Sequence, residues 1–201
     1  KNNRVTDLKI NEKVTGSSHF YSNIMVIGRS FLLSIINDAI ARGYNSFRED
    51  VIMKNLKSLK IYTYDFEGYY ATIDSFGSYF KHNMELLDKQ IRDELFGARD
   101  IYTKVRDSAP SKYGDSAVVR NSLVSDGCIV EGTVENSILF RGVKVGKGSV
   151  VKNSIIMQDT VIGENVSLNC VVTDKNVVIR DRRMLSGCEI QPYFLPKGSM
   201  V

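Results

Sequence analysis

VGKGSVVKNSIIMQDTVIGENVSLN, residues 145–169, carries a branched aliphatic residue at about every sixth position, with Gly, Asn, Asp and Ser in most of the intervals. The same spacing runs from residue 118 to residue 179. Its aliphatic positions form three runs: Val118, Val124 and Val130; Leu139, Val145 and Val151; Ile156, Ile162 and Leu168. This period is the signature of a hexapeptide β-helix. No single coil of such a solenoid buries its aliphatic residue alone, so stability comes from stacking coils into one column.

The repeat changes phase twice along this stretch. It slips by three residues between Val130 and Leu139 and by one between Val151 and Ile156, which predicts bulged corners. An antiparallel sandwich of Val-rich strands is the alternative. Sandwich strands with their turns recur at ~8–12 residues, so the period of six favours the β-helix.

Composition limits the remaining possibilities. The chain has 201 residues, 43% of them hydrophobic, and a formal charge of +4, which suits two modest domains better than one. Its Lys and Arg residues are scattered among acids, so nucleic-acid binding has weak support. No stretch approaches the ~20 apolar residues of a membrane span. The start, KNNRVTDLKI, lacks a signal sequence and an initiator Met, so we expect a cytoplasmic fragment whose beginning is missing.

The cysteines and histidines give no catalytic or metal-binding pattern. Cys128, Cys170 and Cys188 form an odd set without C-x-x-C spacing, which predicts buried free thiols. Hexapeptide acyltransferases use a His as general base, and β-helical carbonic anhydrases need three around zinc. The two histidines, His19 and His82, both precede the repeats, so we expect them at the surface or the edge of the core.

The first half of the chain alternates strand-like and helix-like segments. Strands are predicted at four places: residues 4–10, 22–27, 60–66 and 69–73. A core-facing helix is predicted from Phe31 to Ile40, with Ser30 as its cap and Gly43 at its end. Ser46 and Glu49 form a capping-box pattern before a second, short helix. This alternation predicts an α/β layer.

A third helix and a linker follow. Apolar residues at helical spacing, from Phe76 to Leu87, predict a helix capped by Asp74 or Ser75. From residue 93 to residue 115 the periodicity fails, and Gly97, Pro110 and Gly114 stand among charged residues. We interpret this stretch as a linker.

Three segments together carry a family resemblance: GYYATIDSFGSYFKHNMELLD, IYTKVRDSAPSKY and the repeat region from SLVSDGCIVEG onward. The chain resembles glucose-1-phosphate adenylyltransferase (ADP-glucose pyrophosphorylase) of bacterial glycogen synthesis over nearly its whole length. The resemblance implies the α/β tail of a Rossmann-like nucleotidyltransferase domain (residues 1–92), a linker (93–115) and a left-handed parallel β-helix (116–201). It also implies a tetramer, controlled by small metabolites, that converts ATP and glucose 1-phosphate into ADP-glucose and pyrophosphate.

The chain departs from the family pattern where chemistry is expected. The family's G-Y-W-R-D-V-G-T-I-D contains an Asp that helps hold Mg²⁺, and GYYATID is shorter, with Ala71 or a deletion at that place. A methyl group supplies no oxygen ligand for a hard dication. The Lys of the family's E-K-P motif falls on Asn11, or on Lys13 after a two-residue slip, and a family Ser appears as Tyr21. The family's Gly-rich nucleotide loop is absent from this sequence.

These departures resemble the GlgD-type branch of the family, whose members are regarded as catalytically degenerate. The resemblance implies a regulatory, non-catalytic subunit with no catalytic, cofactor or metal residue in this fragment, and Mg²⁺ is expected for the active complex. Its partner would be a catalytic adenylyltransferase subunit, a second copy bound through the β-helix, or both. Two alternatives stay open. One is a catalytic subunit of this or another sugar-phosphate nucleotidyltransferase with its active site upstream, and the other is a structural β-helix oligomerisation module.

One cluster of basic residues is a candidate binding site. Lys175, Arg180, Arg182 and Arg183 crowd the end of the repeats in TDKNVVIRDRRM. In related enzymes, basic residues of this region contact anionic regulators such as sugar phosphates, phosphate or sulfate. Guanidinium groups suit such ligands because their planar donors bind two oxygens at once. A solvated corner is the competing interpretation, since charge runs usually lie at the surface.

Overall fold

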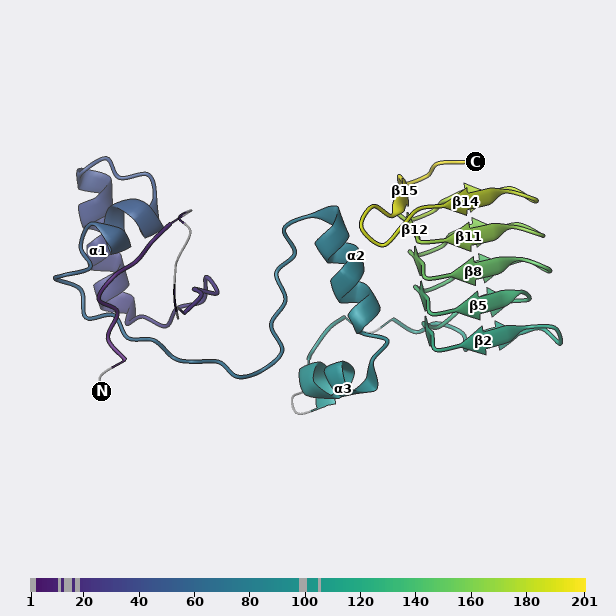
Figure 1. Ribbon diagram of the computed structural model, residues 1–201, viewed down its shortest axis with the longest axis horizontal. Helices are drawn as coiled ribbons and strands as arrows, with labels where there is room; N and C mark the ends of the chain where they lie inside the picture. Colours follow the sequence, from purple (N-terminus) through teal and green to yellow (C-terminus); the bar gives the residue numbers. More distant parts are fainter. Residues whose placement is uncertain (1–2, 11, 13–15, 17–18, 98–100, 105) are drawn as a thin grey trace. The chain divides into compact units, whose positions relative to one another are not determined.

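The chain forms two compact units, Lys1–Glu67 and Gly68–Val201. We describe each by itself from a computed structural model, shown in Figure 1, which describes residues 3–10, 12, 16, 19–97, 101–104 and 106–201. Within these ranges, no helix combines the length and the apolar character needed to cross a bilayer.

The described residues of the first unit form two helices, α1 (Arg29–Ala41) and η1 (Phe47–Met53). The predicted helix is confirmed, but its predicted cap is wrong: Gly28 occupies the N-cap, where no side chain bonds to the first turn. Ser46 caps η1 as predicted, accepting a hydrogen bond from the Glu49 N–H at 3.1 Å. Side-chain capping therefore fixes the start of η1 and not that of α1.

The strands predicted before the solenoid are mostly wrong. Among the described residues of segments 4–10 and 60–66, the only pairing is one antiparallel bridge, Arg4 with Tyr62, and segments 22–27 and 69–73 form no strand. The apolar run at 22–27 lies at the surface, with Ile24 and Val26 exposed. A strand needs a continuous ladder of hydrogen bonds to a neighbouring strand. Beside the bridge, the described backbone offers segments 4–10 and 60–66 only the bonds from the Val5 N–H to the Ile61 carbonyl and from the Thr63 N–H to the Asn3 carbonyl.

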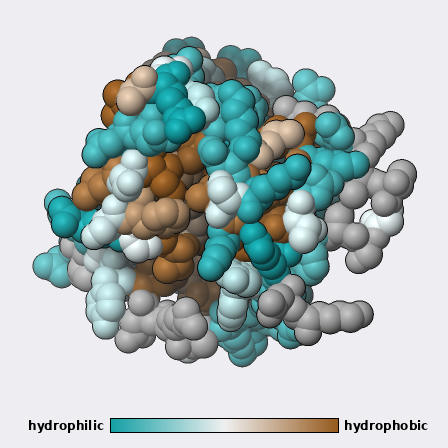
Figure 2. Space-filling model, turned by 90° about the vertical axis from the view of Figure 1, so that its left-hand side faces the viewer, coloured by the Kyte–Doolittle hydropathy of each residue, from teal (hydrophilic) through white to brown (hydrophobic). Residues whose placement is uncertain are grey.

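Apolar side chains gather on the surface of the first unit. The exposed ones include Phe20, Ile24, Val26, Phe31 and Ile40, and Figure 2 shows hydrophobic side chains reaching this face among hydrophilic ones. No residue of α1 is buried. The prediction of a core-facing helix is therefore wrong for this chain, although α1 has the predicted apolar residues.

The second unit begins with three helices, α2 (Phe76–Glu85), α3 (Lys89–Arg92) and η2 (Asp93–Gly97). The predicted cap of α2 is confirmed at Ser75, whose hydroxyl accepts from the Ser78 N–H at 3.1 Å in a reciprocal capping box. The last of these helices, η2, lies in the aperiodic stretch that we interpreted as a linker.

Fifteen short strands then form three parallel five-stranded sheets. Sheet I contains β1 (Lys112–Tyr113), β4 (Ile129–Val130), β7 (Lys144–Val145), β10 (Val161–Ile162) and β13 (Val178–Ile179). Sheet II contains β2 (Val118–Arg120), β5 (Thr133–Glu135), β8 (Val150–Lys152), β11 (Ser167–Asn169) and β14 (Met184–Ser186). Sheet III contains β3 (Leu123–Val124), β6 (Ile138–Leu139), β9 (Ile155–Ile156), β12 (Val171–Thr173) and β15 (Tyr193–Leu195). The chain visits the sheets in the order I, II, III and repeats, which makes a parallel β-solenoid of stacked coils (Figure 1).

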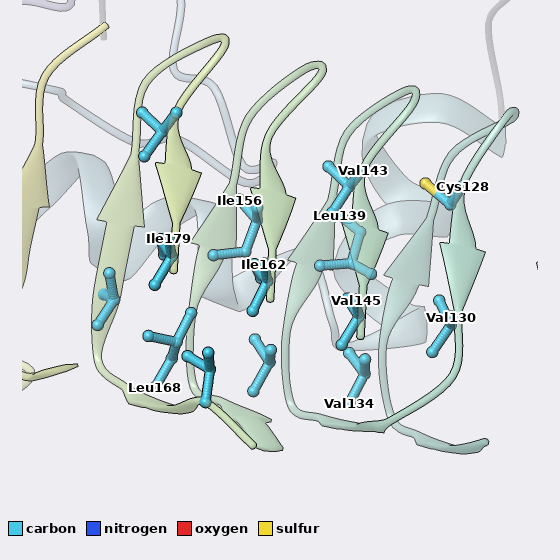
Figure 3. Packing of buried hydrophobic residues seen from close by; sticks show 14 of the residues in the cluster. Cys128, Val130, Val134, Leu139, Val143, Val145, Ile156, Ile162, Leu168 and Ile179 are labelled. Carbon is cyan, nitrogen blue, oxygen red and sulfur yellow. The ribbon is translucent and has the colours of Figure 1, made fainter. Parts of the chain in front are cut away.

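The predicted inward residues form the solenoid core, which confirms the hexapeptide interpretation. Seven of them are buried: Val130, Leu139, Val145, Val151, Ile156, Ile162 and Leu168. Val124 is partly buried against the same cluster. Figure 3 shows labelled members of this column, such as Val145, Ile162 and Ile179, on successive coils. The predicted position at Val118 is wrong, because Val118 is exposed and Val119 packs against the core.

The phase slips arise from shortened corners, so the predicted bulges are wrong. Between Val130 and Leu139 lies a further inward residue, Val134, which pairs with Val151 and is fully buried. The one-residue slip before Ile156 follows from a tight corner at Asn153, whose φ of +47° is left-handed. Asn adopts this conformation more readily than most residues, which explains its recurrence at the corners.

Helix α2 packs on the outer side of sheet III. Its Phe80 is buried in a cluster with Ile155, Cys170 and Val172. Ile155 and Val172 are the neighbours, within their strands, of the inward residues Ile156 and Thr173. This sheet therefore has apolar residues on both faces, and the helix covers the outer one.

Buried serines connect the coils at the corner between sheets II and III. The Ser154 hydroxyl donates to the Lys152 carbonyl at 2.6 Å and accepts from the Val171 N–H of the next coil at 3.1 Å. Ser137 repeats this arrangement one coil earlier, donating to Glu135 and accepting from the Ser154 N–H. Each hydroxyl thus satisfies backbone groups that would otherwise be buried without a partner.

Candidate functional site

The basic residues Arg180, Arg182 and Arg183 lie at the corner between β13 and β14. Hydrogen bonds to the coil before it hold this corner: the Arg182 N–H donates to the Glu164 carbonyl at 2.8 Å, and the Asp181 carboxylate accepts from the Glu164 N–H at 2.8 Å. The backbone of these four consecutive residues is therefore fixed, and their exposed side chains project from a defined turn.

Two backbone features shape the corner. A Cβ on Gly163 would lie 2.8 Å from the Asp181 backbone nitrogen, so only glycine lets the two coils approach this closely. Arg182 has a φ of +60° at a position where earlier coils use Gly148 and Asn165. A long basic side chain in the left-handed region costs about 1 kcal/mol, so Arg182 is a conformational exception in the repeat.

The corner borders a shallow hollow of about 690 Å³. Its lining comprises Val161, Gly163, Val178, Ile179, Arg180, Asp181, Arg182 and Arg183. Among the described residues, none of the three arginines has a carboxylate within 4 Å. Arg180 donates instead to the Met200 sulfur at 3.0 Å. Three guanidinium groups without ion-pair partners beside an apolar wall can bind an oxyanion attached to a small organic group.

Lys175 lies on a different corner. It precedes β13, whereas the arginines follow that strand, and it does not line the hollow. Its backbone N–H donates to the Asp174 carboxylate at 2.7 Å. The structure thus brings together three of the four predicted residues.

The positions expected to carry catalysis offer little chemistry. Ala71 is half-buried in an irregular segment and carries only a methyl group. Asn11 and Lys13 lie outside the described residues, and Tyr21 is half-buried. The described part of the chain contains no group of three or more His, Cys, Asp or Glu side chains that could hold a metal ion. Ala71 therefore supplies no ligand for Mg²⁺.

The histidines occupy the surface and the edge of the core, as predicted. His19 Nδ1 lies 3.1 Å from an Asp65 carboxylate oxygen at the surface. His82 Nδ1, on α2, lies 2.8 Å from Glu85 Oε2, and the Tyr69 hydroxyl also donates to Glu85. Neither histidine lines the hollow.

The cluster of Tyr69, His82 and Glu85 was not predicted, although the i,i+3 spacing of His82 and Glu85 is visible in the sequence. Desolvation, followed by the bond to Glu85, raises the pKa of Tyr69 to about 12. The hydrogen bonds from Tyr69 and then His82 lower the pKa of Glu85. The cluster fastens the segment that carries Ala71 to α2.

The coil path and its Asn and Gly corners define a hexapeptide-repeat solenoid protein. A family model described as "GlmU-like, C-terminal hexapeptide" matches residues 108–189. The glycogen biosynthesis protein GlgD of Bacillus subtilis (strain 168) is 43% identical over 176 residues, covering 87% of this chain and 51% of that relative. GlgD of Geobacillus stearothermophilus is 46% identical over 172 residues, covering 85% of this chain and 50% of that relative.

Glucose-1-phosphate adenylyltransferase of Fervidobacterium nodosum is 35% identical over 147 residues, covering 73% of this chain and 34% of that relative. The chain therefore belongs to the family that contains GlgD and glucose-1-phosphate adenylyltransferase. It spans about half the length of the GlgD proteins that it matches.

Proposed function

We propose that the chain is part of a regulatory, non-catalytic subunit of glucose-1-phosphate adenylyltransferase in glycogen biosynthesis. The observation that carries this proposal is its similarity to two GlgD proteins over more than four-fifths of its length. The segment GYYATID, in which Ala71 or a deletion stands at the place of the family's magnesium ligand, agrees with it. Mg²⁺ and the phosphoryl chemistry would then belong to a catalytic partner subunit, to which this chain binds.

The architecture of the whole protein is part of the proposal. Residues 1–92 would complete a Rossmann-like nucleotidyltransferase domain, 93–115 would link it to the solenoid, and 116–201 would form a left-handed β-helix. The exposed apolar side chains of the first unit support this, because surfaces of this kind are usually covered. The protein would act in the cytoplasm, where the nucleotide and sugar-phosphate substrates of its catalytic partner would be supplied.

The basic corner would bind an anionic effector, a sugar phosphate or phosphate. Arg182 supports this, because the repeat places Gly or Asn at the equivalent corners of earlier coils. Arg180 and Arg183 flank it on the same hollow. Lys175, on the neighbouring corner, would contribute only to the local positive potential.

The test uses the full-length protein mixed with its catalytic partner. The rate of ADP-glucose formation is measured with and without the subunit, across a titration of inorganic phosphate and of a hexose phosphate. We expect the subunit to change the partner's maximal rate or its effector response severalfold. The absence of any change at saturating subunit, together with no binding in light scattering, would overturn the regulatory assignment.

Variants separate the effector site from the subunit contact. The double variant Arg182→Ala, Arg183→Ala should weaken the effector response about tenfold or more while subunit binding persists. Lys112→Ala is the matched control, since Lys112 is an exposed cation at the opposite end of sheet I. If the double variant and the control respond alike, the basic corner is a solvated surface.

A further inference from the structure

Cys170 occupies an unusual place in the repeat. At the corner between sheets II and III, the three earlier coils each use Asn: Asn121, Asn136 and Asn153. The fourth coil uses Cys170, with a left-handed φ of +51°. Cysteine lacks the polar side chain that lets Asn tolerate this conformation, so the turn alone does not account for the substitution.

The corner of the fifth coil lies directly against Cys170. The Gly187 N–H donates to the Asn169 carbonyl at 2.9 Å, and the Tyr193 N–H donates to the Cys170 carbonyl at 2.9 Å. A Cβ on Gly187 would lie only 2.7 Å from that carbonyl oxygen. Cys188 is the next residue, so the two cysteines belong to neighbouring turns of one corner.

The spacing of the coils is compatible with a disulfide. Hydrogen-bonded neighbours in a sheet lie ~4.8 Å apart, which sets Gly187 opposite Cys170 and Cys188 one residue further along, and disulfides join Cα atoms separated by ~4.4 to 6.8 Å. The reduced Cys188 Sγ lies 3.8 Å from the Gln191 carbonyl oxygen, so bond formation requires this side chain to turn toward Cys170. The Cys188 N–H donates to the Gln191 carbonyl at 3.1 Å, which closes the loop of residues 187–192 on itself. The backbone that carries both cysteines is thus held at both ends.

The two thiols differ in accessibility. Cys170 is buried with Phe80 of α2, and burial, followed by the charges of Glu189 and Cys188, raises the pKa of its thiol. Cys188 is exposed, which corrects the prediction that all three cysteines are buried. An oxidant in solution therefore meets Cys188 first.

We propose that Cys170 and Cys188 form a reversible disulfide that joins the fourth and fifth coils. A peroxide oxidises the Cys188 thiolate to a sulfenic acid, with hydroxide as the other product. The Cys170 thiol then attacks the sulfenic sulfur, the S–S bond forms, and the hydroxyl group and thiol proton leave as water. A dithiol reductant reverses the step by thiol–disulfide exchange.

The disulfide would constrain the loop of residues 187–192, which contacts α2. A Cβ on Gly77 would lie 3.1 Å from the Ile190 carbonyl of the loop, and the rings of Phe76 and Phe194 meet edge to face at 5.5 Å. Oxidation therefore ties the loop that touches α2 to the corner beneath it. The reduced loop keeps only its hydrogen bonds and ring contacts.

The test treats the full-length protein with hydrogen peroxide and counts free thiols of peptides from this region after denaturation. We expect Cys170 and Cys188 to be lost together and recovered in one disulfide-linked peptide pair, with Cys128 still free. Dithiothreitol should restore both thiols. Cys188→Ser and Cys170→Asn should each abolish the linked pair, and Cys170→Asn keeps the residue that this corner uses in earlier coils. Cys128→Ser is the control that should leave the bridge intact.

Two results would overturn the proposal. In one, Cys188 alone is oxidised, to a sulfinic acid or to a disulfide between two molecules, while Cys170 stays free. In the other, the linked pair still forms in Cys170→Asn, which would assign the bridge to a different thiol. Oxidised protein that unfolds at the same temperature as reduced protein would show that the bridge does not stabilise the fifth coil.

Discussion

Two adjacent valines in β8 test the inward register of the solenoid. Val151 is fully buried, and Val150, its neighbour on the outer face, is partly exposed. Replacing Val151 with Ala removes two methyl groups, about 1.6 kcal/mol of transfer free energy, and leaves a cavity worth about 1 kcal/mol more. We therefore expect Val151→Ala to lower the free energy of unfolding by about 2.5 kcal/mol.

Val150→Ala removes the same atoms from a partly solvated site, so its cost should stay below about 1 kcal/mol. Urea denaturation followed by circular dichroism measures both variants, and both midpoints should be read from the same transition because coils can unfold separately. Equal losses for the two variants, or a larger loss for Val150→Ala, would refute the register.

Three further predictions concern single contacts. Gly163→Ala places a methyl group against the Asp181 backbone, so thermal unfolding should show a loss of about 2 kcal/mol, whereas Gly28→Ala, which points into open space, should change little. Ser154→Ala leaves the Val171 N–H without its acceptor and should cost about 1–3 kcal/mol; no loss would mean that water replaces the hydroxyl. Tyr69→Phe removes the hydrogen bond that lowers the pKa of Glu85. A carboxyl group whose pKa is lower in the folded than in the unfolded protein stabilises the fold at pH values above the unfolded pKa, and this stabilisation is lost as the pH falls. The difference in unfolding free energy between wild type and Tyr69→Phe should therefore be full near neutral pH and shrink as the pH falls below 4.5. A gap that widens in acid would contradict this account.

The sequence predicts the solenoid well because its repeat is both periodic and local. A branched aliphatic residue at each coil position must point inward, so Val145 and Ile162 are identifiable without a structure. The six-residue spacing does not predict Val134 as an inward residue, because the corner before it is two residues shorter than the regular corners and breaks the period. Val118 is assigned in place of Val119 because two valines in a row leave the facing residue undecided.

The first half is less predictable because its strands depend on distant partners. The apolar run at residues 22–27 has strand composition, yet a strand forms only where another chain segment offers hydrogen bonds. The side-chain caps at Ser46 and Ser75 need only their own turn, and both are confirmed. The reciprocal bond of the predicted box at Ser46 does not form, because the Ser46 N–H donates to Asp50 instead of Glu49.

The basic corner is partly readable from the sequence. The run from Arg180 to Arg183 locates it, because four consecutive residues must share one turn. The separation of Lys175 from the arginines depends on where β13 begins and ends. Whether a described carboxylate lies within reach of the three arginines depends on the neighbouring coils. Sequence spacing fixes neither of these features.

The most direct test of the central claim is the initial rate of ADP-glucose formation by the full-length protein alone, with ATP, glucose 1-phosphate and Mg²⁺ at saturating concentrations. The account predicts no rate above that of a sample without protein, and the same preparation should bind the catalytic subunit, which shows that it is folded. A rate comparable to that of the catalytic subunit would contradict the non-catalytic assignment and would identify the protein as a catalytic subunit.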